Sequence, residues 1–208
     1  MSTKTIIQRC PRAGAFVWIG IWLIAMISPV YGEQIAWDQG RLHSILETEI
    51  KRVERMGQNP ILIKAVLAQN AEGLSLNVIK ERDETWKNSD DTDAFKQAML
   101  ASMAGKYLSN LMKSSKAYTE VFLTDNQGAN VAVSPLTSDY WQGDEDKWRK
   151  AFTPEGGAVF VDAMQWDESS GYNSVQISVP VKQESAVIGV MVVGVKLSHV
   201  LAKQLQDL

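Results

Sequence analysis

Apolar residues between positions 35 and 79 recur at steps of three and four, the spacing that places them on one face of an α-helix. The first stripe consists of Leu42, Ile45, Leu46, Ile50 and Val53. Gly57 and Asn59 interrupt it, and Pro60 is suited to the first turn of a new helix. The pattern therefore predicts a long helix over 35–56 and a second one that runs from Pro60 past Gly73 to Ile79.

A third helix is expected after the polar stretch ERDETWKNSDDTD, residues 81–93. Asp91 or Thr92 could act as its N-cap, because short polar side chains accept hydrogen bonds from the free N–H groups of a first helical turn. The apolar stripe that follows consists of Phe95, Met99, Met103, Tyr107, Leu108, Leu111 and Met112.

From Thr119 onward the apolar period changes to two, which is typical of β-strands. Strands over 121–123 and 131–133 flank a turn, DNQG, rich in residues that tolerate positive φ. A pair over 158–167 and 172–181 flanks a second turn, ESSG. Along 172–181 valine and isoleucine alternate with Ser174, Gln176 and Ser178, so these polar residues are expected on the opposite face. The last strand, 186–197, is apolar on both faces and should be central.

These elements predict an α+β fold in which long N-terminal helices pack on a five-stranded antiparallel sheet. The helical layer would span residues 33–118 and the sheet domain residues 119–208. Apolar residues make up 45% and charged residues 22% of the 208 residues, as in an ordinary folded domain.

Residues 1–32 resemble an export signal. A basic start that ends at Arg12 precedes an apolar run from Ala13 to Val30, and Pro29 with Gly32 suits cleavage after Gly32. An uncleaved membrane anchor is the alternative, because the run is at the lower limit of a bilayer span. Either form predicts a periplasmic protein, tethered to the inner membrane if the signal is retained.

Charge and cysteine content exclude several classes of function. Residues 1–32 hold three of the 21 basic residues and no acid, so the remainder has 18 basic and 24 acidic residues, a net charge of −6. An acidic body argues against nucleic acid as a partner. The single cysteine is Cys10, within the predicted signal, which excludes a disulfide, a thiolate metal site and a cysteine nucleophile from the rest of the chain.

The segments TDNQG, SDYWQGDEDKW, VFVDAMQWDESSG, YNSVQISVPV and IGVMVVGV together resemble the single Cache family, the extracellular PAS-like sensor domains of bacteria. The resemblance covers about 80 residues of the sheet. It implies a five-stranded sheet behind a long N-terminal helix, a ligand pocket between the sheet and the insert, and weak dimers formed along that helix. Many relatives continue into a second membrane helix and an output domain, whereas this sequence ends at Leu208, so we expect a separate signalling protein to receive the signal.

Five residues are the candidates for ligand binding. Tyr140, Trp141 and Trp148 offer flat apolar walls with polar tips, although they could equally seal the insert onto the sheet. Asp162 lies among apolar neighbours on its strand, where a carboxylate is costly unless it has a partner. Gln176 is a weaker candidate, because a polar strand face is usually the solvated side.

Catalysis and metal binding have little support in the sequence. The acidic runs at 90–93 and 144–146 lie at expected helix starts, where carboxylates favour the helix dipole. His43 and His199 lie far apart without metal-ligand spacing, and there is no Gly-x-Ser-x-Gly turn. We therefore predict neither an enzyme nor a bound cofactor.

Two hypotheses of function remain. The first is a sensor module that binds a small organic acid, amino acid or amine and relays its occupancy to a membrane or periplasmic signalling partner. The second is a ligand-free interaction subunit of an envelope complex, since a fold does not fix a function.

Overall fold

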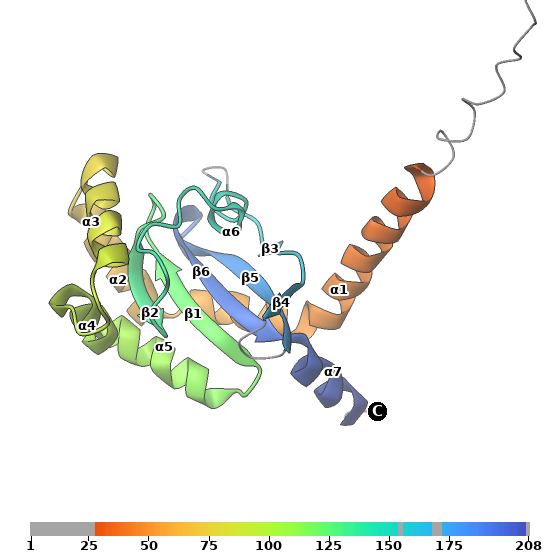
Figure 1. The fold of residues 1–208 in the computed structure, drawn as a ribbon. Helices are drawn as coiled ribbons and strands as arrows, with labels where there is room; N and C mark the ends of the chain where they lie inside the picture. Colours follow the sequence, from red (N-terminus) through yellow and green to blue (C-terminus); the bar gives the residue numbers. More distant parts are fainter. Residues whose placement is uncertain (1–27, 154–155, 168–171, 207–208) are drawn as a thin grey trace, which may run out of the picture. The chain divides into compact units, whose positions relative to one another are not determined.

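The computed structural model describes residues 28–153, 156–167 and 172–206 (Figure 1). Its helices are α1 (Ser28–Gly57), α2 (Pro60–Ala71), α3 (Leu76–Asn88), α4 (Ala94–Ala101), α5 (Met103–Ser114), α6 (Asp146–Arg149) and α7 (Leu197–Gln206). Its strands are β1 (Tyr118–Thr124), β2 (Asn130–Ser134), β3 (Phe160–Val161), β4 (Gln165–Asp167), β5 (Tyr172–Gln183) and β6 (Ala186–Lys196). The chain divides into two units, Met1–Asp38 and Gln39–Leu208, and the fold described below is that of the second.

The strands form one antiparallel sheet in the order β2-β1-β6-β5-β3, and β4 also pairs with β5. This sheet and the helices before it confirm the predicted α+β class. β6 lies between β1 and β5, and its residues from Ile188 to Val195 are buried. The run of valines is therefore central, as its apolar character on both faces predicts.

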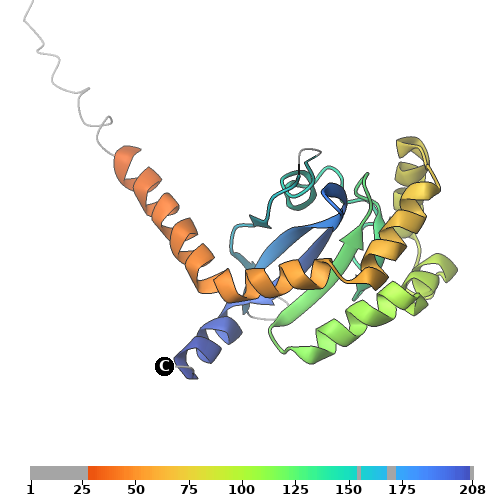
Figure 2. The same ribbon diagram turned by 180° about the vertical axis from the view of Figure 1, so that it is seen from behind.

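One face of the sheet is covered by α2, α5 and the part of α1 that belongs to the second unit (Figure 2). Leu46, Ile50 and Val53 of the predicted stripe are buried there. They belong to the same core as Val121, Leu123, Ile177, Val179, Met191 and Val193 of the strands. The alternation of β5 explains this, because every second residue points to the helices.

The opposite face carries a second core under the segment between β2 and β3. It includes Phe122, Val190 and Val192 from the strands, with Trp86 of α3 and Tyr140 of the intervening segment. Both faces of the sheet therefore carry a core, and Ser178 of β5 is buried beneath the second one, whereas Ser174 and Gln176 are partly exposed.

Two of the predicted helices are each divided in two. The second predicted helix, from Pro60 to Ile79, corresponds to α2, which ends at Ala71, and the first part of α3. Between them the backbone passes through the left-handed region at Gly73, with φ +61°, and Ser75 caps α3. The third is interrupted at Ser102, whose side chain accepts a hydrogen bond from the N–H of Gly105 at 2.9 Å and so caps α5. A cap within an apolar stripe starts a new helix without changing the three- and four-residue spacing.

Two local predictions are wrong in detail. The N-cap of α4 is Asp93, which accepts from the N–H groups of Phe95 and Lys96, and not Asp91 or Thr92. The strand predicted over 158–167 is two short strands, β3 and β4.

Residues 1–27 of the predicted export signal lie outside the described residues, and α1 begins at Ser28. Among the residues that are described, no helix is both long and apolar enough to cross a membrane. The domain boundaries at residues 32 and 118 stay predictions.

Candidate functional site

The insert, which we define as residues 135–153, crosses the sheet face opposite to α2 and α5 (Figure 1). It is held against the β1–β2 turn by close backbone contact. A Cβ at Gly128, which has φ +84°, would lie 2.4 Å from the Cα of Gly143. The N–H of Gln142 donates to the carbonyl of Gly128 at 2.7 Å. Both glycines are therefore required for the insert to dock at this turn.

Asp83 of α3 fixes the middle of the insert. Its Oδ1 accepts hydrogen bonds from the backbone N–H groups of Tyr140, at 2.8 Å, and Trp141, at 3.0 Å. Its Oδ2 accepts one from Nζ of Lys87 at 2.5 Å. Hydrogen bonds to a carboxylate are stronger than those between neutral groups, so Asp83 ties α3 firmly to the insert.

Tyr140 is fully buried, between the insert and helices α3 and α4. Its ring centroid lies 6.0 Å from that of Trp86 and 5.4 Å from that of Phe95. Within the described part of the chain its hydroxyl has no hydrogen-bond partner. Burial raises the pKa of this phenol, and the Arg82 guanidinium opposes that effect. Tyr140 is thus a wall of the aromatic core, and its predicted ligand contact stays a prediction.

The two predicted tryptophans both bind the β1–β2 turn. Nε1 of Trp141 donates to the carbonyl of Gln127 at 2.8 Å, and Nε1 of Trp148 donates to that of Asp125 at 3.3 Å. The Trp148 ring is stacked on Phe152, with centroids 4.8 Å apart and planes 11° apart. The structure therefore brings Trp141 and Trp148 together at one end of the insert, each with its polar atom already paired.

The side chain of Lys147, in α6, is a positively charged group of the insert that is largely buried. Its ammonium lies 5.3 Å from the ring centroid of Phe122 and 2.8 Å from a carboxylate oxygen of Glu145. Its side chain is only 13% exposed. Glu145 takes one of the three donors of this ammonium, and a lysine held near an aromatic face and away from bulk water favours an anion as a further partner.

Lys150 follows three positions later, as the C-cap residue of α6, and is far more exposed, at 53%. Its ammonium lies 4.6 Å from the ring centroid of Phe160 and pairs with Asp146 at 2.9 Å. Hydrogen bonds from Arg149 and Lys150 lower the pKa of Asp146. Both lysines therefore have a carboxylate partner. They differ in exposure, because the Lys147 side chain is largely buried and the Lys150 side chain is in contact with solvent.

The sheet below these lysines contains a buried hydroxyl, that of Ser178, without a partner among the described residues. Phe160, Ser178, Val192 and Phe122 pair in register across β3, β5, β6 and β1, and we call them the Ser178 row. Ser178 is fully buried, and no described residue forms a hydrogen bond with its Oγ. A buried polar atom without a partner is uncommon in a protein core and needs an explanation.

Asp162 and Gln176 belong to the next row of paired residues. The N–H of Asp162 donates to the carbonyl of Gln176 at 2.9 Å, and Nε2 of Gln176 donates to Glu120 at 2.7 Å. Gly194 of β6 pairs with both Gln176 and Glu120, so their side chains meet over a residue that has none. This Gln176 row lies about 7 Å along the strands from the Ser178 row.

Sequence reasoning did not identify Lys147, Ser178 or Glu120. Lys147 lies in the run DEDKWRK, which is typical of a solvated helix start. Ser178 was interpreted as a residue of the solvated face. The alternation along β5 did contain the signal, since it places Ser178 and Gln176 on one face, but it cannot tell whether another segment covers that face.

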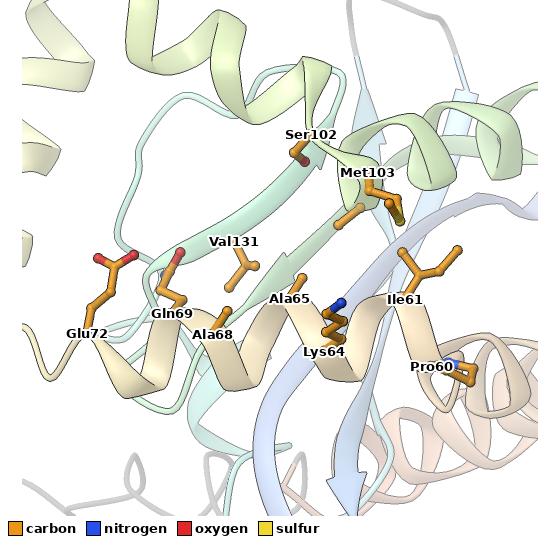
Figure 3. Close-up of a pocket in the computed structure, with 11 residues that line it drawn as sticks. Pro60, Ile61, Lys64, Ala65, Ala68, Gln69, Glu72, Ser102, Met103 and Val131 are labelled. Carbon is orange, nitrogen blue, oxygen red and sulfur yellow. The ribbon is translucent and has the colours of Figure 1, made fainter.

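Figure 3 shows a separate groove of about 530 Å³ on the helical side, along α2. Its lining is mainly apolar and includes Ile61, Ala65 and Met103, with Lys64 and Glu72 as its charged residues. None of the five predicted ligand residues lines it. No three histidine, cysteine or acidic side chains of the described residues are grouped so that they could hold a metal ion.

The sequence matches no protein-family profile, and no curated protein matches it. Solved structures that are similar to this chain include sensor domains of signalling receptors. The sensor domain of the V. cholerae histidine kinase DctB is 16% identical, with a TM-score of 0.41; 82% of this chain and 57% of that chain are covered.

Two chemoreceptor domains are also similar to this chain. The ligand-binding domain of the Pseudomonas aeruginosa PAO1 amino acid chemoreceptor PctC, solved with GABA, is 14% identical with a TM-score of 0.39. The match covers 76% of this chain and 64% of that chain. The sensory domain of the Campylobacter jejuni chemoreceptor Tlp3, solved with isoleucine, is 17% identical with a TM-score of 0.37. The match covers 77% of this chain and 65% of that chain. This chain therefore spans less than two thirds of the length of each of these three.

Proposed function

We propose that this protein is an exported sensor module that binds a small carboxylate-bearing metabolite between the insert and the sheet. The observation that supports it best is the position of Lys147, a largely covered cation held over Phe122. Ligand sites are mostly apolar, with a few polar groups that fix the orientation of the ligand. Lys147 and the unpaired hydroxyl of Ser178 provide such groups on this face.

The acidic side chains of the Gln176 row suggest that the ligand also has a positively charged group. Glu120 and Asp162 belong to this row, about 7 Å from the row that includes Phe122 and Ser178. A carboxylate near Lys147 and an ammonium group near these acids would complement both charges. The favoured ligand is therefore a small zwitterion of the amino acid class, with Trp141 and Trp148 closing one end of the site.

The proposed chemistry is recognition and not reaction. Occupancy would change how the insert packs on the sheet, and a separate periplasmic or membrane protein would receive that change. A ligand can shift a conformational equilibrium only if it binds the two states with different affinity. A ligand that bridges α6 and the strands meets this condition, because its contacts require the insert to be docked.

The experiment is a thermal-shift screen of the purified protein against amino acids, amines and small organic acids. The expected result is stabilisation by a ligand that has a carboxylate, together with loss of that stabilisation in Lys147→Gln. Loss of a buried charged partner typically costs about 2 kcal/mol or more of binding free energy. Arg149→Gln is the matched control, because it removes one positive charge from a 57% exposed residue of the same helix, and it should retain the response.

The ligand-free interaction subunit is favoured by one observation, the apolar groove along α2 in Figure 3. An exposed apolar surface marks binding sites for other proteins in many cases. A screen without any ligand response, combined with a partner that co-purifies and is lost when Ile61 and Met103 are replaced by polar residues, would support this function instead. An equal ligand response in wild type and Lys147→Gln would contradict the proposed site.

A further inference from the structure

A second pocket lies where α1, the end of α5 and α7 meet. It has a volume of about 340 Å³. Its lining residues are Thr48, Glu49, Arg52, Ser114, Ser115, Lys116, His199, Val200 and Lys203, and we call it the basic pocket. In both ribbon views α7 lies at the opposite end of the sheet from α6 (Figures 1 and 2). The basic pocket is therefore distinct from the site proposed under the insert.

The charge of this pocket is opposite to that of the chain as a whole. Its acid, Glu49, is 6% exposed and already has two partners. Arg52 lies 3.4 Å from one of its carboxylate oxygens, and the Tyr118 hydroxyl donates to the other at 3.3 Å. One carboxylate and one guanidinium thus neutralise each other at the buried end of the pocket.

The remaining charged residues of the pocket are Lys116 and Lys203, and His199 lies beside them. Within the described residues, none of the three forms an ion pair with a carboxylate. They come from two different segments, the α5–β1 connection and α7, that meet only in the folded chain. Lys116 and Lys203 are exposed and line one cavity, and among the described residues neither has a carboxylate partner, so an anion between them would pair with both.

Hydroxyl donors complete the lining. Thr48 and Ser115 contribute hydroxyl groups beside the lysines, whereas the O–H of Ser114 already donates to the carbonyl of Leu111 at 2.7 Å. The Oγ of Ser115 accepts from the N–H of Ala117 at 3.2 Å, which leaves its O–H free to donate. Ammonium and hydroxyl donors from several directions suit a tetrahedral oxyanion, and two positive charges suit one that is at least divalent.

We propose that the basic pocket binds a phosphate-type anion, supplied either as a soluble compound or as the headgroup of a phospholipid. Bound there, the anion contacts α1, the α5–β1 connection and α7 at once. It therefore fixes α7 against the rest of the domain. This function does not depend on the insert or on a ligand of Lys147.

The test is a calorimetric titration of the full-length protein with inorganic pyrophosphate at low ionic strength. We expect saturable binding in the wild type and binding at least about tenfold weaker in Lys116→Gln/Lys203→Gln, because each lysine forms a charge-assisted contact. Lys64→Gln/Lys106→Gln is the matched control, with the same loss of charge at exposed positions outside the pocket, and should retain the affinity. Circular dichroism and thermal melts of both double variants verify that they are folded.

A second arm identifies the source of the phosphate group. The protein is floated with phosphatidylcholine vesicles that contain or lack phosphatidylglycerol. Binding to the anionic vesicles that pyrophosphate competes away supports a lipid headgroup, and pyrophosphate binding without vesicle binding supports a soluble compound. The proposal is overturned if neither probe binds the wild type, or if the pocket variant and the control variant bind alike.

Discussion

At the scale of single residues, Tyr140 shows the difference between an aromatic wall and a ligand contact. Its ring fills the core between the insert and α3–α4, and its hydroxyl is buried without a partner among the described residues. We expect Tyr140→Phe to be within about 1 kcal/mol of wild-type stability at pH 7, because it removes an unsatisfied buried group.

The same variant should differ from the wild type at alkaline pH. Burial raises the pKa of the Tyr140 phenol, against the influence of Arg82, so the folded state disfavours the phenolate. A raised pKa gives stability that is complete below about pH 10 and is lost as the pH rises through the folded-state value. Urea unfolding at about pH 7 and above about pH 10 measures how much unfolding free energy each protein loses between the two conditions. This loss should be smaller for Tyr140→Phe than for the wild type. An equal loss in both proteins would contradict this assignment.

Ser178 and Thr124 provide a matched pair on the insert-facing side of the sheet. Both are fully buried, but among the described residues only Thr124 has a partner for its hydroxyl, the carbonyl of Val190 at 3.1 Å. Thr124→Val should cost about 1 kcal/mol, whereas Ser178→Ala should leave the free energy of unfolding nearly unchanged. If the ligand binds beneath the insert, Ser178→Ala should also reduce the ligand-induced rise in melting temperature. Denaturant titrations with and without ligand measure both quantities.

At the scale of elements, β6 can occupy the centre of the sheet only because two of its residues are glycines. A Cβ at Gly189 would lie 2.2 Å from the backbone oxygen of Thr124, and the backbone cannot move without disturbing the β1–β6 pairing. At Gly194 the nearest atoms, at 2.3 Å and 2.8 Å, belong to the side chains of Thr119 and Glu120.

These two contacts predict different costs for the same substitution. Gly189→Ala should destabilise the protein by about 2 kcal/mol or more, and Gly194→Ala by clearly less, because side chains can rotate away. Gly194→Ala should also displace Glu120 from Gln176 and so alter the ligand response. Thermal unfolding of the two variants side by side tests the order, and equal costs would show that the strand itself shifts.

The first helix bears on self-association. Leu46, Ile50 and Val53 of its stripe are buried in the chain's own core, and Leu42 and Ile45 are only partly covered. Weak dimers along this helix stay a prediction, and they would rest on those two outer residues. Light scattering over a concentration series should show the apparent mass rise, and Leu42→Ser should abolish that rise. A constant monomer mass would contradict it.

At the scale of the whole molecule, the predicted export signal has a direct test. The basic start, the apolar run and Pro29 predict removal of residues 1–32. Mass spectrometry of the protein recovered from cells should find a chain that begins at Glu33. Recovery of the intact chain from the membrane fraction would favour the uncleaved anchor.

The sequence by itself determined the class of fold and the central position of β6. Periodicity reports which face of a helix or strand is apolar, and an alternating pattern such as that of β5 leaves few alternatives. It also directed attention to the insert, since Trp141, Trp148, Asp162 and Gln176 all lie on or beside the insert-facing side of the sheet; their role in ligand binding stays a prediction. The sequence predicted the helix boundaries less well, because a cap such as Ser102 starts a new helix without changing the three- and four-residue spacing of the apolar positions.

Only the tertiary structure decided which polar residues of that segment face each other. Lys147 lies in a charged run that is typical of solvated helices, and its ammonium meets Phe122 only because the insert folds back over β1. Likewise, Lys116 and Lys203 are 87 positions apart and share a pocket because α7 packs beside the end of α5. Local pattern records the preference of each residue for water or core, whereas a site depends on distances between segments that the chain brings together only when it folds.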